Sequence, residues 1–225
     1  MKTSKAQAQD NRAHVVQTAS ALFRERGYDG VSVAELMAAA GFTHGGFYKQ
    51  FRSKADLMAE SAACGMAQTA ALAAGMDRPA FVRSYLSRAH RDTRAVGCTM
   101  AALGADAARQ PKAVRAAFAE GIEHLLQALE KEVPAPEQTG SGAAGEIGEM
   151  GEVRAHAIDT LAHAVGALVL SRACPDDSPL ADEILSVCRG QMLRRLAATA
   201  PKPRKLPQSL PFKTRSVAVR ASEPR

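Results

Sequence analysis

The amino-acid sequence predicts an all-α fold, on three observations. Apolar side chains recur at helical spacing along most of the 225 residues, as in the stripe formed by Val16, Ala19, Leu22 and Phe23. No run of residues alternates between apolar and polar in the way that a half-buried β-strand requires. Glycines and N-capping residues interrupt the pattern at intervals typical of short helices joined by tight turns.

The first two helical segments are short and well delimited. A helix over about residues 11–26 precedes a glycine, the residue type favoured just beyond a helix C-terminus. Ser32 and Glu35 have the spacing of a capping box, in which each side chain accepts a hydrogen bond from the other residue's backbone N–H. This cap predicts a helix over about residues 33–40, which ends at Gly41.

The stretch GFTHGGFYKQFRSK, residues 41–54, predicts a further short helix with Thr43 as its N-cap. Two capped helices separated by a tight turn form a helix-turn-helix, here over residues 32–51. In this motif the second helix enters the DNA major groove by its N-terminal residues. Gly45 and Gly46 lie in its first turn, where the missing side chains allow the backbone to approach DNA closely.

The predicted DNA contacts divide between base edges and phosphates. His44 is the side chain expected to reach a base edge, whereas Tyr48 and the nearby lysines are expected to bind phosphates. The predicted DNA-binding residues are Ser32, Thr43, His44, Gly45, Gly46, Tyr48, Lys49 and Lys54. A buried helix pair that tolerates its glycines is the alternative on these residues alone.

Longer helical segments follow the helix-turn-helix. Ser53, with Asp56 three residues later, predicts the start of a helix that runs toward Ala74. The later segments are an amphipathic stripe over about 114–129, a Pro/Gly/Ser-rich flexible loop at 134–145, an alanine-rich helix over about 146–173 and a last helix that carries residues 185–196.

The segment FTHGGFYKQFRSKADL resembles the signature of the TetR family of bacterial transcription regulators, and the preceding ALFRERGYDGVSVAELMAAAG resembles the family's first two helices. The resemblance covers about residues 9–69 and implies a DNA-binding domain over that range. It also implies a C-terminal effector-binding and dimerisation domain over residues 76–200. Gly46 stands where the family usually has Thr, Ser or Ala, and Gln50 replaces a frequent His.

The last two helices are implied by this resemblance to pair with their copies in a four-helix bundle. Small side chains between Ala157 and Ala167 would allow close helix approach, and the apolar surface exceeds one protomer's need. The predicted interface residues are Leu161, Val165, Leu168, Leu185 and Met192. The alternative is that these helices form only the core of a monomer.

The middle helices, about residues 81–129, are expected to line an effector pocket. The predicted lining is Phe81, Cys98, Met100, Leu103, Phe118 and Ile122. These side chains are mostly apolar and include no cation, so we expect an apolar or amphipathic small molecule as the effector.

Cys98 belongs to GCTMAAL, residues 97–103, which resembles a Gly-Cys motif at the start of the sixth helix in one branch of the family. A helix N-terminus favours the thiolate form of cysteine, so a redox or electrophile sensor is one reading. A small buried residue at a tight helix start is the favoured one.

His156, Asp159 and His163 share one face of the long helix. Metal ligation needs such groups directed to one point. A polar stripe is the favoured interpretation, and no metal or cofactor is predicted.

The net charge of +6 arises in the last 25 residues, 201–225, which hold seven Lys/Arg against one Glu. Prolines and cations without an apolar face predict a basic, disordered tail there. The four cysteines show no CxxC spacing and the N-terminus shows no signal peptide, so the sequence predicts a cytoplasmic protein. No helical stretch is predicted to span a membrane.

No phosphate-binding loop, GxSxG or HExxH motif is present, so no enzyme is predicted. The predicted function is sequence-specific regulation of transcription by a homodimer, as a repressor that releases a palindromic operator in double-stranded DNA when a small molecule binds. The alternatives are a thiol-based sensor that acts through Cys98 and a constitutive DNA binder without an effector.

Overall fold

The computed structural model describes residues 4–74, 76–131 and 143–199. These residues form helices, turns and loops, with no strand among them, which confirms the all-α prediction. Most of the predicted loop at 134–145 and the whole predicted tail at 201–225 lie outside the described residues.

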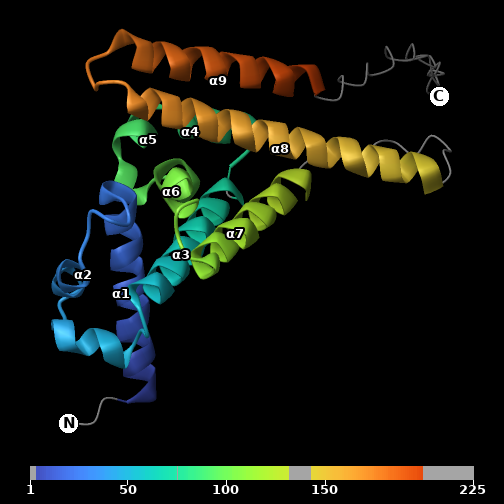
Figure 1. Cartoon of the computed structure of the whole chain (residues 1–225). Helices are drawn as coiled ribbons and strands as arrows, with labels where there is room; N and C mark the ends of the chain where they lie inside the picture. Colours follow the sequence, from blue (N-terminus) through green and yellow to red (C-terminus); the bar gives the residue numbers. More distant parts are fainter. Residues whose placement is uncertain (1–3, 75, 132–142, 200–225) are drawn as a thin grey trace, which may run out of the picture.

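The helices fall into an N-terminal group and a larger C-terminal group (Figure 1). The N-terminal group and the helix that follows it are α1 (Lys5–Arg26), α2 (Val33–Ala39), the 3₁₀ helix η1 (His44–Lys49) and α3 (Lys54–Ala74). The C-terminal group is α4 (Arg78–Tyr85), α5 (Arg88–Asp92), the 3₁₀ helix η2 (Arg94–Val96), α6 (Thr99–Ala107), α7 (Lys112–Lys131), α8 (Ala143–Ala173) and α9 (Pro179–Thr199).

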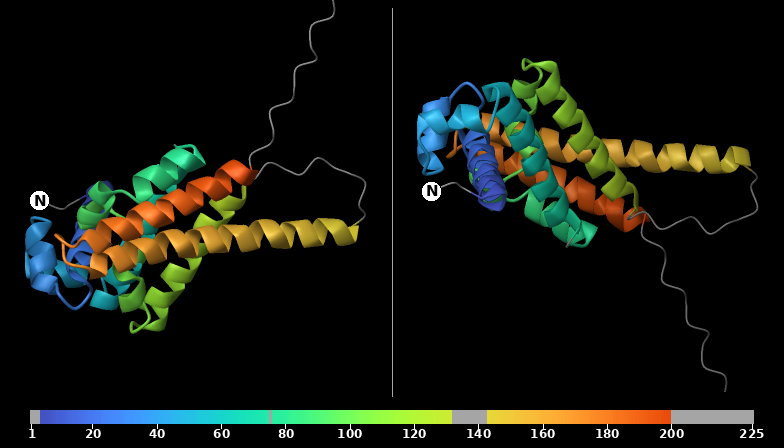
Figure 2. Two further views of the ribbon diagram at one scale, coloured as in Figure 1. Left: turned by 90° about the horizontal axis from the view of Figure 1, so that it is seen from above. Right: turned by 90° about the horizontal axis from the view of Figure 1, so that it is seen from below.

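The two groups share one continuous apolar core. Helices α8 and α9 lie side by side along one edge of the molecule, whereas α2 and η1 lie at one end beside α1 (Figures 1 and 2). Helix α3 packs against α1 on one side and against α7 on the other. Helix α3 therefore contacts both helix groups.

The predicted capping box is present at the start of α2. The Ser32 hydroxyl accepts from the Glu35 backbone N–H at 3.2 Å, and the Glu35 carboxylate accepts from the Ser32 N–H at 2.8 Å. The Ser32 hydroxyl also donates to the Glu35 carboxylate at 2.6 Å, and this bond, together with that from the Ser32 N–H, lowers the pKa of the Glu35 carboxyl below its ordinary value. Gly41, at φ +77°, then turns the chain toward η1.

The predicted α-helix after Thr43 is a 3₁₀ helix instead, and the Thr43 side chain makes no capping hydrogen bond. The Gly46 N–H donates to the Thr43 carbonyl at 2.9 Å, which is an i→i+3 bond. Two glycines in a six-residue helix lower its α-helical propensity by about 1 kcal/mol each, so the tighter form is retained.

Three predicted dimer-interface residues lie inside the protomer, which corrects that assignment. Leu168, Leu185 and Met192 are buried, while Leu161 and Val165 are half-buried. They pack where α8 and α9 meet the rest of the core, because the inner face of an amphipathic helix carries its largest apolar side chains. The exposed apolar residues of the pair are Ile158, Val169, Leu170, Leu180 and Val187.

One described segment, Gly151–Ala173 within α8, is long and apolar enough to cross a membrane by length and composition. In this fold the segment packs against α9 and buries Ala157, Ala164 and Leu168. A core helix of this kind meets the same length and composition criteria.

Candidate DNA-binding interface and effector cavity

The outer face of η1 carries most of the predicted DNA-binding side chains. Thr43, His44, Tyr48 and Lys49 are all exposed, and so is Ser32 at the start of α2. The opposite face of η1 carries buried Phe47, which stacks on buried Phe51 at a centroid distance of 5.4 Å. Aromatic packing thus fixes which side of η1 faces solvent.

Tyr48 is an exposed aromatic side chain, with 67% of its surface accessible. Its ring meets the His44 ring edge-on at 6.1 Å, so the two side chains form one exposed platform. A large exposed amphipathic ring is unfavourable in water unless a partner covers it, and a phosphate can accept from its hydroxyl.

The two glycines of η1 face different surroundings. No protein atom lies within 4 Å of the point where a side chain at Gly45 would begin. At Gly46 the nearest atom is the terminal methyl of Met37, at 3.5 Å. The packing of the protomer therefore does not require glycine at position 45, and close approach of DNA to this residue stays a prediction.

Lys54 is less available to a ligand than the sequence indicates. Its ammonium donates to the Tyr28 carbonyl at 2.6 Å and lies 5.9 Å from the centre of the Phe23 ring. This bond ties the start of α3 to the segment that follows α1. An ammonium has three donors, so a phosphate contact by Lys54 stays a prediction alongside this structural role.

Arg12, on α1, is a positioning residue that sequence reasoning missed. Its Nη1 donates to the Gln50 carbonyl at 2.6 Å, its Nη2 pairs with Glu60, and its guanidinium lies 4.2 Å from the centre of the Phe51 ring. These contacts brace the C-terminal end of η1. The partners are 38 and 48 residues away in the chain, so no local pattern indicates them.

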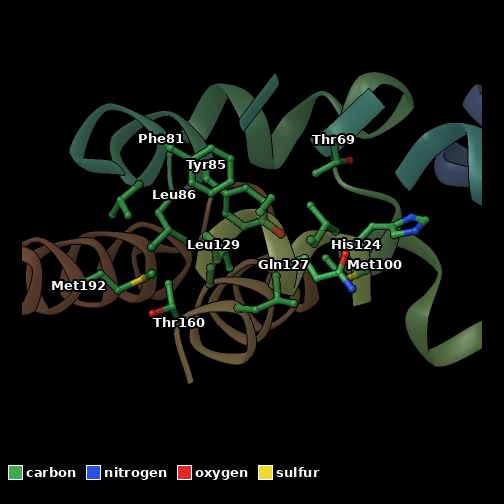
Figure 3. A pocket seen from close by; sticks show the side chains of 15 residues that line it. Thr69, Phe81, Tyr85, Leu86, Met100, His124, Gln127, Leu129, Thr160 and Met192 are labelled. Atoms are coloured by element: carbon green, nitrogen blue, oxygen red, sulfur yellow. The ribbon is translucent and has the colours of Figure 1, made fainter. Parts of the chain in front are cut away.

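The C-terminal helices enclose a cavity of about 510 Å³, within the range of small-molecule sites (Figure 3). Phe81 and Met100, both predicted, are in its lining. The lining residues are Thr69, Phe81, Val82, Tyr85, Leu86, Met100, His124, Leu125, Gln127, Ala128, Leu129, Thr160, Leu161, Ala164 and Met192. None of them is Asp, Glu, Lys or Arg, so the wall bears no permanent charge.

The six predicted pocket residues do not lie in one cavity. Phe118 and Ile122 line a separate, more open hollow of about 520 Å³ between α6, α7 and α8, which also contacts Met100. Cys98 lines a smaller hollow of about 160 Å³. Leu103 is buried in the core and lines none of these hollows. The residues separate because successive turns of α6 and α7 face different neighbours.

Tyr85 lies between the main cavity and the smaller hollow, since its ring belongs to both walls. Burial raises the pKa of its phenol well above the ordinary value, and the neighbouring Cys98 thiol adds to this shift. The hydroxyl is buried without an oxygen or nitrogen partner. Tyr85 therefore stays neutral, and its hydroxyl lies beside the Cys98 thiol.

Cys98 is buried, at 1% exposure, as the N-cap of α6, as the sequence predicts. Its backbone N–H donates to His90 Nε2 at 3.1 Å, and His90 Nδ1 lies 2.7 Å from the Tyr85 carbonyl. These two bonds assign His90 as a neutral imidazole with its proton on Nδ1. The burial of Cys98 limits attack by an external electrophile, which needs access to a thiolate.

One member of the polar stripe of α8 forms an ion pair. Asp159 pairs with Arg195 at 2.6 Å. Among the described residues, no group of three His, Cys, Asp or Glu side chains is arranged to hold a metal ion.

Helices α1, α2 and η1 form one end of the molecule, and η1 exposes a face that contains glycine. This arrangement, joined to a helical body with a cavity, is that of helix-turn-helix DNA-binding proteins. The sequence matches the family of bacterial regulatory proteins, tetR family, over residues 15–60, and the tetracyclin repressor-like C-terminal domain over residues 75–186. The chain belongs to the TetR family of bacterial transcription regulators.

Individual relatives agree with this assignment. The HTH-type transcriptional regulator AcrR of Shigella flexneri is 39% identical over 57 residues, which are 25% of this chain and 26% of AcrR. The chain is thus aligned to about a quarter of that relative's length.

Solved structures extend the likeness to the whole fold. The reduced form of Escherichia coli NemR matches with a TM-score of 0.62 at 20% identity, over 82% of this chain and 96% of NemR. A TetR-family regulator from Cytophaga hutchinsonii matches with a TM-score of 0.61 at 17% identity, over 86% of this chain and 98% of that one. At these identities the likeness establishes the fold.

We expect His90 to make the fold sensitive to mild acid. Burial lowers its pKa below 6.5, with the nearby Arg172 charge in the same direction and the Tyr85 carbonyl opposed. Below about pH 6.5 the unfolded chain binds a proton that the folded chain does not, so stability falls as pH falls. The loss from pH 7.5 to 5.5 should be below about 1 kcal/mol, because the imidazole is partly exposed.

Urea denaturation at the two pH values checks this expectation. The His90→Gln variant should lose less stability on acidification than the wild type. The exposed His124 provides the matched control, since His124→Gln should leave the wild-type dependence unchanged. Equal pH dependence in the wild type and His90→Gln would contradict the assignment.

Proposed function

We propose that this TetR-family regulator is a homodimeric repressor that binds a palindromic operator and releases it when a small molecule occupies the 510 Å³ cavity. The observation that carries the proposal is that one helix, α3, joins both sites. It begins beside η1 at Lys54, and Thr69 near its other end lines the cavity. A ligand in the cavity can act on DNA only by favouring one arrangement of the two reading segments over another.

DNA reading is assigned to the exposed face of η1. His44 and Tyr48 project from the segment on one side, and Lys49 adds a cation. Imidazole reaches base edges in the major groove, whereas Lys49 and the Tyr48 hydroxyl suit phosphates. In the proposed dimer, two such segments lie about one turn of DNA apart, roughly 34 Å.

Dimerisation is assigned to the exposed apolar stripe of α8 and α9. Exposed Ile158 and Val169, with the half-buried Val165 between them, follow one another at spacings of seven and four residues on α8. Leu180 and Val187, seven residues apart, extend the surface onto α9. Two helices with apolar outer faces bury them best against a second copy of the same pair, in a two-fold bundle.

The effector is assigned to uncharged molecules with an apolar body. The described wall of the cavity offers no counter-ion, and an unpaired charge brought into it would lose its hydration without compensation. His124 and Gln127 on α7 are exposed residues of the wall, whereas Tyr85, Leu86 and Met192 are buried. A ligand is thus expected to place its polar end toward the α7 side chains.

A thiol-based sensor through Cys98 and a constitutive DNA binder are the remaining alternatives. The burial of Cys98 disfavours the first. The second leaves the cavity without a role. The proposed site of action is the cytoplasm, and we propose that the protein acts by binding rather than by catalysis.

Substitutions in η1 should separate base reading from phosphate binding. His44→Ala should lose about 1–3 kcal/mol at one base position and relax the preference there. Lys49→Ala should weaken binding to all sequences alike and reduce the salt dependence by about one phosphate contact. Quantitative gel shifts on single-base variants of a duplex selected by the wild-type protein measure both. Identical profiles for the two variants would contradict the assigned roles.

A charge on the outer face of α8 should separate the protomers. Val169→Asp should convert the dimer to a monomer at micromolar concentration, because the carboxylate would be desolvated between two apolar helix pairs. Light scattering measures the mass. Val96→Asp, at another exposed apolar residue, is the control and should remain a dimer. A monomeric wild type that still binds a full palindrome tightly would argue against the interface.

The cavity should select against charge. We expect 2-naphthol to raise the melting temperature and release operator DNA, and 2-naphthoate and 2-naphthylmethylammonium to bind at least about tenfold more weakly. Thr160→Asp, in the cavity wall, should shift the preference toward the ammonium compound. Tighter binding of either charged compound by the wild-type protein would refute the assigned class of effector. Release of operator DNA that occurs in the wild type but not in Cys98→Ser would favour the thiol sensor.

A further inference from the structure

We propose that Arg24 is the positioning residue that couples the effector region to the DNA-binding helices. Its guanidinium joins the C-terminal part of α1 to η2 and to the first residue of α6. The inference rests on the proposed function, because it assigns the route by which an occupied cavity alters operator binding.

Arg24 makes five hydrogen bonds, three of which cross the junction between the two helix groups. Nε and Nη2 both donate to the Ala95 carbonyl, at 2.8 and 2.6 Å. Nη1 donates to the Thr99 hydroxyl at 3.4 Å and to the Ser20 hydroxyl at 2.8 Å, and Nη2 also donates to Gln68 Oε1 at 3.4 Å. The side chain thus links α1, α3, η2 and the first turn of α6.

Arg24 is a buried cation, at 5% exposure, and the four acceptors of its five hydrogen bonds are all uncharged. Burial lowers its pKa below the ordinary value. Such a charge is tolerated only while its hydrogen bonds are complete, and these bonds weaken steeply when their geometry is lost. Its acceptors therefore hold a fixed relation to α1.

Gly65 on α3 makes room for this junction. A side-chain carbon there would overlap the Thr99 hydroxyl and lie 2.5 Å from Arg24 Nη1 and 2.9 Å from the Ser20 hydroxyl. The Ser20 hydroxyl in turn donates to the Ser61 carbonyl of α3 at 2.9 Å. The contacts of Arg24 thus depend on the packing of α1, α3 and α6.

The acceptors of Arg24 adjoin the walls of the cavities. Thr99 is followed by Met100, which lines both large cavities, and Ala95 is followed by Val96, which lines the smaller hollow with Cys98. A ligand that displaces Met100 moves the first turn of α6. Since Thr99 belongs to that turn, the displacement reaches Arg24 and α1.

The other end of α6 also contacts α1. Asp106 Oδ2 lies 2.9 Å from the point where a side chain at Gly27 would begin, and the Asp106 charge adds to the burial that raises the pKa of Tyr28. A tilt of α6 is therefore resisted at both ends of the helix. Arg24 contacts the end of α6 that adjoins the cavity.

A double-mutant cycle tests the coupling without a known effector. Ala164→Phe fills part of the main cavity and serves as the probe of occupancy. In the wild-type background it should weaken binding of a duplex selected by the wild-type protein by about tenfold, a typical allosteric effect. In the Arg24→Met background the same substitution should change binding by less than about twofold.

Two further backgrounds make the result specific. Thr99→Val removes one acceptor on α6 with little change in volume and should also reduce the response. Arg26→Met, at an exposed arginine of the same helix, should retain the full tenfold response. Melting temperatures establish that each variant is folded.

The outcomes separate the coupling from the proposed function. A tenfold response that persists in Arg24→Met and Thr99→Val would overturn the role of Arg24, even if melting temperatures fall, because a merely structural residue lowers stability without uncoupling the sites. No response to Ala164→Phe in the wild-type background would contradict the proposed effector cavity, and the Arg24 route with it.

Discussion

The packing of α3 between α1 and α7 is the constraint on which the rest of the structure depends. Leu57 and Met58 are buried near its start, and Met66 lies where α3 crosses α7. A side-chain carbon at Gly121 of α7 would lie 2.6 Å from Met66 Cγ, so the two helices approach too closely for any larger residue. The position of α7, and of the cavity wall that it forms, is therefore tied to the position of the DNA-binding helices.

This arrangement divides stability from recognition. The buried aromatics Phe47 and Phe51, with Arg12 over the Phe51 ring, fix the position of η1. The exposed residues of η1 therefore do not contribute to the core. The same face accepts features that lower stability, namely a glycine pair and an exposed tyrosine. Functional surfaces commonly carry such local inconsistencies, because binding needs groups that folding would otherwise bury or replace.

The effector region combines an apolar wall with isolated polar groups. Burial favours the neutral forms of Tyr85 and His90, so the proposed effector region offers hydrogen-bonding groups rather than charges. Two buried cations lie outside the cavity wall: Arg91, which pairs with Asp92 and Asp176, and Arg24. The partners of Arg24 are uncharged, so the buried guanidinium is stabilised only while each acceptor stays within hydrogen-bonding distance.

The sequence by itself determined the helical class, the start of α2 and the family, because capping and glycine signals act over three or four residues and the helix-turn-helix is a local motif. It also placed Cys98 at the start of α6. Only the tertiary structure decided that η1 is a 3₁₀ helix, that Leu168, Leu185 and Met192 face the core, and that the predicted pocket residues line separate cavities. These outcomes depend on contacts between residues tens of positions apart in the chain. Apolar periodicity shows which face of a helix is buried, but not which other element covers it.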